Sequence, residues 1–487
     1  MSRLLALLLL LPGQGKPADH PLKHRILWTW DTWISEYDPQ GESYLQEYKD
    51  LLDWMAKNEY TALVVWGFID GRHGGEAAAK ELARYARGKG IALLPGVSTD
   101  IGAYHAYGGF VLGIKDHPFN DEVQARAMAA TRRPGELNLC PSRPENREWL
   151  QKGTRWLLEN FEVDGVNLET AEGGIRCRCA ECQERQKAQG GATGGASFSD
   201  LSIGVPIVTD VFREKRPAGL VTYAAYSPLW WDQKPAALEM LKRIPESAVA
   251  QWNLELAVNE TIASPVKSNL ALLHGGGESY HFRRLRPPAW AFTQYRCFYP
   301  RIDRLRSFCA NVRKMKLDGF VAGNAGSPKN PDAELAYHAF IDFSRDPDLT
   351  MEAFFKKRIG ALYGDGAAED VSRLFAAQPA IHEKGLPYWQ KHDGAWDAKT
   401  PDRAKEAAKG FADQLTLART AAAKASADGK RRLDAIIPIL DEYRIVCEAA
   451  ASGQFDGGTA ETRAKLAEFY DKSGLPDDLY TFRKWKP

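Results

Sequence analysis

Asp164-Gly165-Val166-Asn167-Leu168-Glu169 is the stretch of sequence that indicates the fold most directly. Asp-Gly is a turn dipeptide, and the apolar residues that follow it are typical of a short buried strand. The same order returns at Asp318-Gly319-Phe320-Val321-Ala322-Gly323-Asn324. An amphipathic helix is predicted upstream of each stretch, over residues 146–161 and 302–316. We therefore interpret both Asp-Gly pairs as turns that begin a strand.

Outward from these two units, short apolar runs alternate with longer amphipathic segments. The predicted strands cover residues 26–30, 60–66, 91–97, 166–169, 220–226, 248–252, 270–274 and 320–324. Helices are predicted at residues 44–57, 76–89, 146–161, part of 200–215, 235–243 and 302–316. This alternation indicates a parallel sheet, and eight units favour an α/β fold closed into a (β/α)8 TIM barrel. An open doubly wound sheet is the alternative, but no glycine-rich phosphate loop follows the first strand.

The strand signal ends after Pro347. Segments rich in Ala, Lys, Glu and Leu predict helices at residues 349–364, 367–384, 402–427 and 430–452, and a glycine-rich break precedes a last helix at 460–472. We therefore predict a catalytic barrel over residues 24–346 and an α-helical C-terminal region over residues 347–487.

The first residues are not expected to belong to the fold. Arg3 is followed by an apolar run over residues 4–11 and then by Pro12-Gly13, a pattern typical of a secretory signal peptide. The run is shorter than the roughly 20 residues that a membrane-spanning helix needs. We assign residues 1–20 to a signal peptide. The mature protein is then expected to be secreted or periplasmic, with no integral membrane segment.

The composition excludes some classes of protein. The chain has 487 residues, of which 44% are hydrophobic and 26% charged, so it can form a large core and is not predominantly disordered. The 64 Lys and Arg residues nearly balance 63 Asp and Glu residues, which argues against a nucleic-acid partner. The 14 Trp and 18 Tyr residues offer flat surfaces on which apolar ligand faces stack.

In a barrel of this type, functional residues lie at the C-terminal ends of the strands. Carboxylates, amides and aromatic rings occur together at the predicted C-terminal ends of the strands. Sugar chemistry needs this mixture: carboxylates transfer protons, polar groups bind hydroxyls, and aromatic rings stack on pyranose faces. We expect an oligo- or polysaccharide substrate. The predicted substrate-binding residues are Trp30, Trp66, Asp100, Asn167, Tyr226, Trp230, Trp231, His274 and Asn324.

Glu169 is the strongest candidate for a catalytic residue. Alternation along the strand places Asn167 and Glu169 on the same side, so that Glu169 points into the barrel mouth if Leu168 packs outward. A carboxyl group held there among Trp residues would be desolvated, which raises its pKa and suits a general acid. A strand-end Glu paired with Lys or Arg is the structural alternative. The second carboxylate is left open among Glu172, Glu255 and Glu278.

Four of the seven cysteines form a group. Cys177, Cys179 and Cys182 lie within six residues, and Cys140 precedes them. Four thiolates bind Zn²⁺ tetrahedrally, and the cysteines of an exported protein can equally form disulfides. The spacing leaves structural zinc and disulfides equally open. A catalytic metal is not expected, since no His lies nearby in the sequence, and we predict no required cofactor beyond a possible structural zinc.

Three stretches together carry a family resemblance. They are Leu139-Cys140-Pro141-Ser142 with Pro144-Glu145-Asn146-Arg147, residues 164–169 with the Cys-x-Cys-x-x-Cys loop, and residues 337–364, which end in Ala361-Leu362-Tyr363-Gly364. The chain resembles bacterial glycoside-hydrolase-like (β/α)8 barrel proteins, similar to α-glucuronidase-like and family 20 hexosaminidase-like enzymes, with a Cys-rich loop after the fourth strand. The resemblance covers roughly residues 26–364.

That resemblance implies glycosidase activity and carries the general-acid role to Glu169 alone. The hexosaminidase Gly-Gly-Asp-Glu motif is absent, and Asn167-Leu168-Glu169 stands at the comparable strand end, so the substrate-assisted N-acetyl mechanism is not implied. We predict an exported glycoside hydrolase, active in carbohydrate metabolism and polysaccharide degradation. One alternative is a non-catalytic carbohydrate-binding or surface-assembly protein on a degenerate barrel. Another is a metal-dependent hydrolase or redox protein built on the cysteines.

Overall fold

A computed structural model describes most of the chain. The described residues are 20–29, 44–69, 74–98, 140–169, 179–188, 198–224, 235–253, 267–273, 302–323, 326–385 and 400–452, with 464, 465, 468 and 472.

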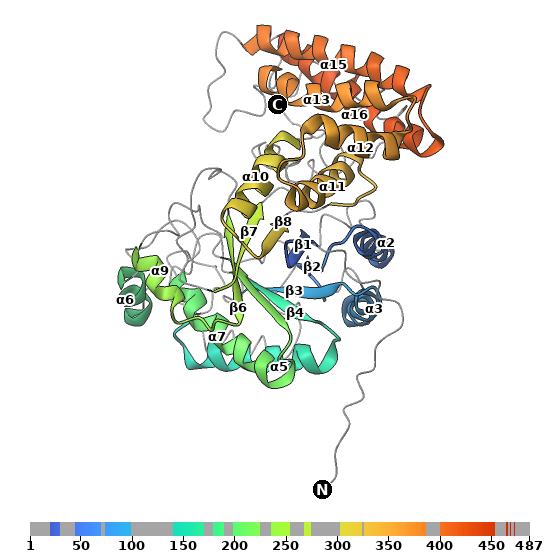
Figure 1. Cartoon of the computed structure of the whole chain (residues 1–487). Coiled ribbons are helices and arrows are strands. Elements are labelled where there is room, and N and C mark those ends of the chain that lie inside the picture. Colours follow the sequence, from blue (N-terminus) through green and yellow to red (C-terminus); the bar gives the residue numbers. More distant parts are fainter. Residues whose placement is uncertain are drawn as a thin grey trace.

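Eight parallel strands form a closed barrel in sequence order, with β8 paired to β1 (Figure 1). The strands are β1 (His24–Thr29), β2 (Ala62–Val65), β3 (Ala92–Ser98), β4 (Gly165–Glu169), β5 (Leu220–Ala224), β6 (Ala248–Asn253), β7 (Asn269–Leu273) and β8 (Gly319–Ala322). This arrangement confirms the predicted (β/α)8 TIM barrel.

Helices connect the strands and cover the barrel. They are α2 (Tyr44–Lys57), α3 (Gly75–Gly88), α5 (Pro144–Asn160), α6 (Ala180–Ala188), α7 (Phe198–Lys215), α9 (Pro235–Leu241), α10 (Ile302–Lys314) and α11 (Pro331–Arg345). Two of them, α6 and α11, lie outside the ranges in which the sequence predicted helices.

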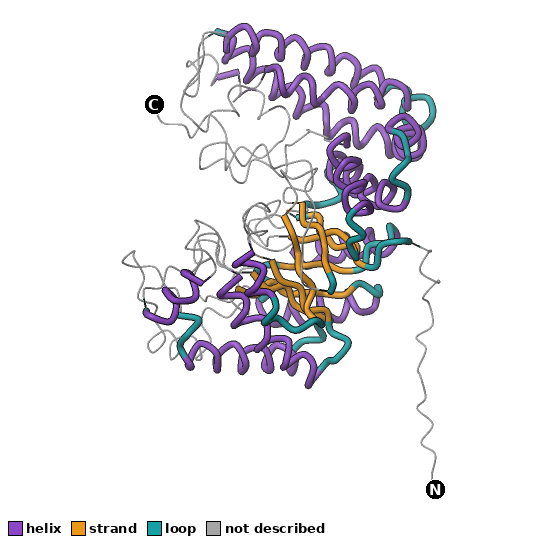
Figure 2. The backbone as a smooth tube through the Cα atoms, turned by 60° about the vertical axis from the view of Figure 1, so that its left-hand side comes forward, coloured by secondary structure: helices purple, strands orange, loops and turns teal. Residues whose placement is uncertain are grey.

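The C-terminal region is helical, as predicted, and its helices lie together on one side of the barrel (Figures 1 and 2). They are α12 (Met351–Tyr363), α13 (Ala368–Gly385), α15 (Thr400–Ala422) and α16 (Ala427–Ala451). Most of the last predicted helix, at residues 460–472, lies outside the described residues, and the boundary at residue 346 remains a prediction. In the described part of the chain, no helix combines the length and hydropathy that crossing a bilayer requires.

The strands bury both of their faces, because successive side chains point to opposite sides of a strand. One apolar cluster fills the inside of the barrel and contains Ile26, Trp28, Ala62, Val64, Trp66, Leu94, Ala224, Val249, Leu270 and Val321. A larger cluster joins the outer faces of the strands, including Leu27, Leu63 and Leu168, to the helices. Strands buried in this way read as continuous apolar runs, which is the pattern that the sequence presents.

Both Asp-Gly pairs lie at strand starts, where the backbones of neighbouring strands approach closely. A Cβ atom on Gly165 would lie 2.1 Å from the carbonyl oxygen of Leu220, and one on Gly319 would lie 1.9 Å from that of His24. Only glycine fits such a contact. Asp318 reinforces its turn, because its Oδ2 accepts a hydrogen bond of 2.7 Å from the backbone N–H of Asn269. These pairs therefore stabilise the end of the barrel opposite the strands' C-terminal ends.

Helix α11 is the joint between the barrel and the C-terminal helices. Every residue from Pro331 to Ser344 is buried. On the barrel side, Phe340 stacks on Phe320 of β8 with ring centroids 5.0 Å apart. On the other side, Glu334 accepts two hydrogen bonds, of 2.6 and 2.8 Å, from the guanidinium of Arg432 in α16. The helix is thus covered on both sides.

Candidate active site at the end of β4

The structure places Glu169 at the C-terminal end of β4 and inside the barrel. Asn167 and Glu169 are both fully buried, and the side-chain Nδ2 of Asn167 donates a hydrogen bond of 3.0 Å to Oε1 of Glu169. Leu168, between them, packs in the outer cluster against the helices. The two polar side chains therefore share the inner face of β4, as strand alternation predicted.

The amide of Asn167 is oriented by two further strands. Its Oδ1 accepts hydrogen bonds from Oγ1 of Thr222 in β5 at 2.8 Å and from Nε2 of Gln251 in β6 at 2.7 Å. With two donors on its oxygen, the amide presents its NH₂ group to Glu169. Thr222 and Gln251 were not predicted as site residues. Their signal in the sequence is a polar residue at an inward position of an otherwise apolar strand.

Glu169 is the only Asp or Glu within the eight strands. The inner cluster around it is apolar, and Asn167, on the same face of β4, donates a hydrogen bond to it. Burying a carboxylate in such surroundings is costly unless hydrogen bonds compensate it. A barrel that needed only packing at this position would be more stable with an apolar residue, so the placement of Glu169 favours a functional role.

Trp66 lies next to this pair. It follows β2, is only 2% exposed, and packs against Trp28 with ring centroids 6.2 Å apart. A Cβ atom on Gly96 of β3 would lie 2.3 Å from Cδ2 of Trp66, so the indole covers the inner face of Gly96. Gly96 pairs in register with Asn167. The indole therefore forms apolar packing beside Asn167, and the sugar-stacking role of Trp66 remains a prediction.

The other predicted site residues lie outside the described residues, so their roles remain predictions. They are the candidate second carboxylates Glu172, Glu255 and Glu278, the candidate substrate-binding residues Trp30, Asp100, Tyr226, Trp230, Trp231, His274 and Asn324, and Cys177.

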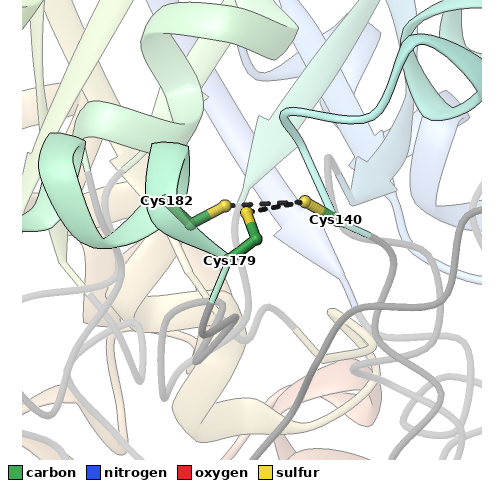
Figure 3. A group of neighbouring side chains, drawn as sticks. All are labelled: Cys140, Cys179 and Cys182. Carbon is green, nitrogen blue, oxygen red and sulfur yellow. Dashed lines mark hydrogen bonds between the residues drawn. The ribbon is translucent and has the colours of Figure 1, made fainter.

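Three of the four grouped cysteines meet beside β4 (Figure 3). Cys140 precedes α5, and Cys179 and Cys182 lie at the start of α6. The Sγ atom of Cys140 is 3.6 Å from that of Cys179 and 3.6 Å from that of Cys182, and all three sulfur atoms lie within 4.8 Å of one another. No disulfide joins these three cysteines.

The surroundings of Cys182 favour its thiolate form. A hydrogen bond from Cys140 has the largest effect, and against the opposing effect of burial it lowers the pKa of the Cys182 thiol to about 4, with further help from Ser142, Arg185 and Cys179. Ser142 Oγ lies 3.2 Å from the sulfur, and a guanidinium N–H of Arg185 donates to it at 3.3 Å. Cys182 therefore offers an anionic sulfur atom on the side that faces Cys140 and Cys179.

Comparison with known proteins shows that the chain is similar in fold to solved structures. No protein-family model and no curated protein matches the chain. A solved 4-O-methyl-α-glucuronidase of glycoside hydrolase family 115, with specificity for decorated arabinogalactans, superposes with a TM-score of 0.57 at 10% identity, over 96% of this chain and 60% of that one. A mutant O-GlcNAc hydrolase from Thermobaculum terrenum gives 0.52 at 11% identity, over 94% and 90%. The chain has a glycoside-hydrolase-like fold.

A third solved structure, the family 20 exo-β-N-acetylglucosaminidase of Vibrio harveyi, gives a TM-score of 0.44 at 12% identity, over 70% of this chain and 57% of that one. The chain thus spans less than two thirds of both the glucuronidase and the acetylglucosaminidase. The two superpositions above 0.5 confirm, at the level of the fold, the resemblance that the sequence indicated.

Proposed function

We propose that this chain is a glycoside hydrolase in which Glu169 is the general acid/base. One observation carries the proposal: the only acidic residue in the eight strands is buried at the C-terminal end of β4, faces inward, and is held by the amide of Asn167. In (β/α)8 enzymes, catalytic groups are presented at this end of the barrel. The glycoside-hydrolase-like fold agrees with that assignment.

The chemistry follows from a carboxyl group in this position. The protonated Glu169 donates its proton to the glycosidic oxygen as the bond between that oxygen and the anomeric carbon breaks. The resulting carboxylate then accepts a proton from the water that adds to the anomeric carbon in a retaining reaction. Asn167 acts as a positioning residue, because its N–H fixes the orientation of the carboxyl group.

A second carboxylate completes the proposed reaction. The candidates Glu172, Glu255 and Glu278 follow β4, β6 and β7 in the sequence. A carboxylate about 5 Å from Glu169 would act as nucleophile with retention of configuration, whereas one at roughly 6.5–9.5 Å would activate water with inversion. The anomer of the first sugar product, measured by NMR, distinguishes these outcomes.

The proposed substrate is an oligo- or polysaccharide. Two of the solved relatives in fold are named for activity on 4-O-methyl-α-glucuronides and on O-GlcNAc, so uronides and N-acetylhexosaminides are the first glycosides to test. We further propose that the protein is exported, since residues 1–20 carry the pattern of a signal peptide.

The proposal is tested with purified protein on aryl α- and β-glycosides of uronic acids, N-acetylhexosamines and neutral hexoses. Glu169→Gln should lower kcat about 10²–10⁴-fold, the usual contribution of a general acid/base. The loss of kcat/KM, which reports the step that breaks the glycosidic bond, should be greatest for poor leaving groups and smallest for dinitrophenol, which departs without protonation. Glu352→Gln, an exposed change in α12, is the matched control and should leave kcat unchanged.

Two results would overturn the assignment. Equal loss of kcat/KM for all leaving groups would show that Glu169 is structural and not an acid. Absence of hydrolysis across the whole panel, together with binding of glycans that survives Glu169→Gln, would favour the carbohydrate-binding alternative.

A further inference from the structure

We propose that Cys140, Cys179 and Cys182 bind a structural zinc ion that fastens the start of α6 to the segment before α5 (Figure 3). This site is separate from the proposed hydrolytic chemistry, and its test does not depend on enzyme activity. The sequence left zinc and disulfides equally open, and the arrangement of the three sulfur atoms favours zinc.

The sulfur spacing fits a metal. A tetrahedral zinc ion with Zn–S bonds of about 2.3 Å holds its sulfur ligands about 3.8 Å apart. Cys140 lies 3.6 Å from each of the other two sulfur atoms. A disulfide would join only two of them, at about 2.05 Å, and would leave the third thiol unpaired beside it. Because Cys140 is equally distant from both partners, the geometry favours one centre shared by three sulfur atoms.

The charge around the sulfur atoms is also that of a metal site. Each cysteine binds zinc as a thiolate, so its S–H proton passes to solvent as the Zn–S bond forms, and nothing is oxidised or reduced. Three thiolates leave one excess negative charge on the complex. Arg185 meets this charge by donating to Cys182 Sγ at 3.3 Å and is itself held by Asp200 at 3.1 Å. Hydrogen-bonded partners of this kind orient metal ligands.

The packing of α6 supplies an independent reason for a metal. Cys182 is the only buried residue in this nine-residue helix, and short helices depend on tertiary packing for their stability. One small buried side chain gives α6 little apolar contact, so a bond from Cys182 through zinc to Cys140 would account for its fixed position. Cys177 lies outside the described residues, and the proposal rests on the three sulfur atoms above.

Metal analysis of the purified full-length chain tests the site. We expect about one zinc ion per chain after dialysis against metal-free buffer. Cys182→Ser and Cys179→Ser should each lower the bound zinc about tenfold or more. Cys447→Ser is the matched control: Cys447 is equally buried but lies in α16 and not in the cysteine group, so this variant should keep its zinc.

Cobalt replacement gives a readout on the unmodified chain, and so does not depend on whether the variants fold. Co²⁺ bound to thiolates should show sulfur-to-cobalt charge-transfer bands in the near ultraviolet, which zinc then removes. A chain that carries no zinc and fails to take up cobalt after reduction would overturn the proposal. So would a disulfide from Cys140 to Cys179 or Cys182, found by peptide mapping under non-reducing conditions, or full zinc retention in both serine variants.

Discussion

Asn167 links the fold to the chemistry proposed for Glu169. Its side-chain oxygen is occupied by donors from β5 and β6, so its NH₂ group is directed along β4 toward the carboxyl group. Three neighbouring strands therefore determine the orientation of one carboxyl group. A site built on strands in this way is held more precisely than one built on loops, because the closed barrel fixes the positions of its strands.

Gly96 permits the indole of Trp66 to lie beside that network. Replacing it by Ala would bring Cβ to 2.3 Å from Cδ2 and 2.4 Å from Cε2 of the ring, and a rigid ring in a packed interior cannot shift easily. We predict that Gly96→Ala lowers the free energy of unfolding by about 1–3 kcal/mol, as overpacking usually does, measured by urea denaturation.

Gly88→Ala in α3 is the matched control for this prediction, because a Cβ atom there meets nothing within 4 Å. It should leave the stability unchanged or raise it slightly. The double change Gly96→Ala with Trp66→Phe should recover part of the loss, since a smaller ring relieves the overlap. If Gly96→Ala is as stable as the unchanged chain, the indole does not lie where we describe it.

At the scale of elements, the sequence predicted all eight strands of the barrel and missed two of the helices that the structure describes, α6 and α11. The strands were recognisable because strands buried on both faces read as apolar runs between amphipathic helices. Helix α11 was missed because it is buried from Pro331 to Ser344, so its polar residues Glu334, His338 and Asp342, which are four residues apart, do not mark a solvent-exposed face. Helix α6 was missed for the opposite reason, since only Cys182 in it is buried.

The candidate site was predicted only in part, for a physical reason. Alternation within one strand was enough to place Asn167 and Glu169 on one face. The contacts of Thr222 and Gln251 with Asn167 depend on the register of three strands and on the curvature of the barrel, which no single stretch of sequence encodes. The cysteine spacing likewise gave no distance between sulfur atoms. A zinc site and a disulfide differ in that distance, so the sequence alone left both open.

Helix α11 also makes stability depend on pH. Burial, with the nearby charge of Arg358, lowers the pKa of His338 from 6.5 to about 4. The unfolded chain therefore takes up a proton between pH 6.5 and 4 that the folded chain does not, and stability falls as the pH falls through this window. We predict a loss of up to about 1.4 kcal/mol per pH unit from this residue.

Urea denaturation at several pH values measures this effect, and His338→Gln, whose amide does not titrate, should have a flatter slope between pH 6.5 and 4. Asp342 provides the internal comparison. Burial alone would raise the pKa of its carboxyl group, but hydrogen bonds from Arg358 and Lys357 hold that pKa below its ordinary value. The stability that Asp342 contributes is therefore lost only at still lower pH. The unchanged chain and the His338→Gln variant should lose it to the same extent. Equal slopes above pH 4 would contradict the assignment to His338.

At the scale of the whole molecule, the C-terminal helices act as part of the barrel's packing. Tyr60, which precedes β2, donates from its hydroxyl to the carbonyl oxygen of Tyr337 at 2.9 Å, so α11 is fixed to the barrel. Phe343 of α11 packs on Phe354 of α12 with ring centroids 4.9 Å apart. Helix α11 therefore packs against both the barrel and the C-terminal helices.

A chain that ends at Asp346 tests whether the barrel is independent of that region. Truncation there removes α12 and α16, and with them the rings and the guanidinium that cover the outer side of α11. Glu334 would lose Arg432, and Asp342 would lose Arg358; breaking a buried pair by removing one partner costs roughly 3–5 kcal/mol. Since domains are stable by only about 5–15 kcal/mol, we predict that the shortened chain unfolds without a cooperative transition and binds a hydrophobic dye.

The full-length Arg432→Met variant separates the lost pair from the lost helices. It removes one charge and keeps the apolar cover, so it should still unfold cooperatively, at a lower urea midpoint than the unchanged chain. A chain ending at Asp346 that unfolds cooperatively at the midpoint of the full-length protein would show that residues 24–346 are a self-sufficient domain. The barrel would then be stable without the C-terminal helices, even though these helices bury the outer side of α11.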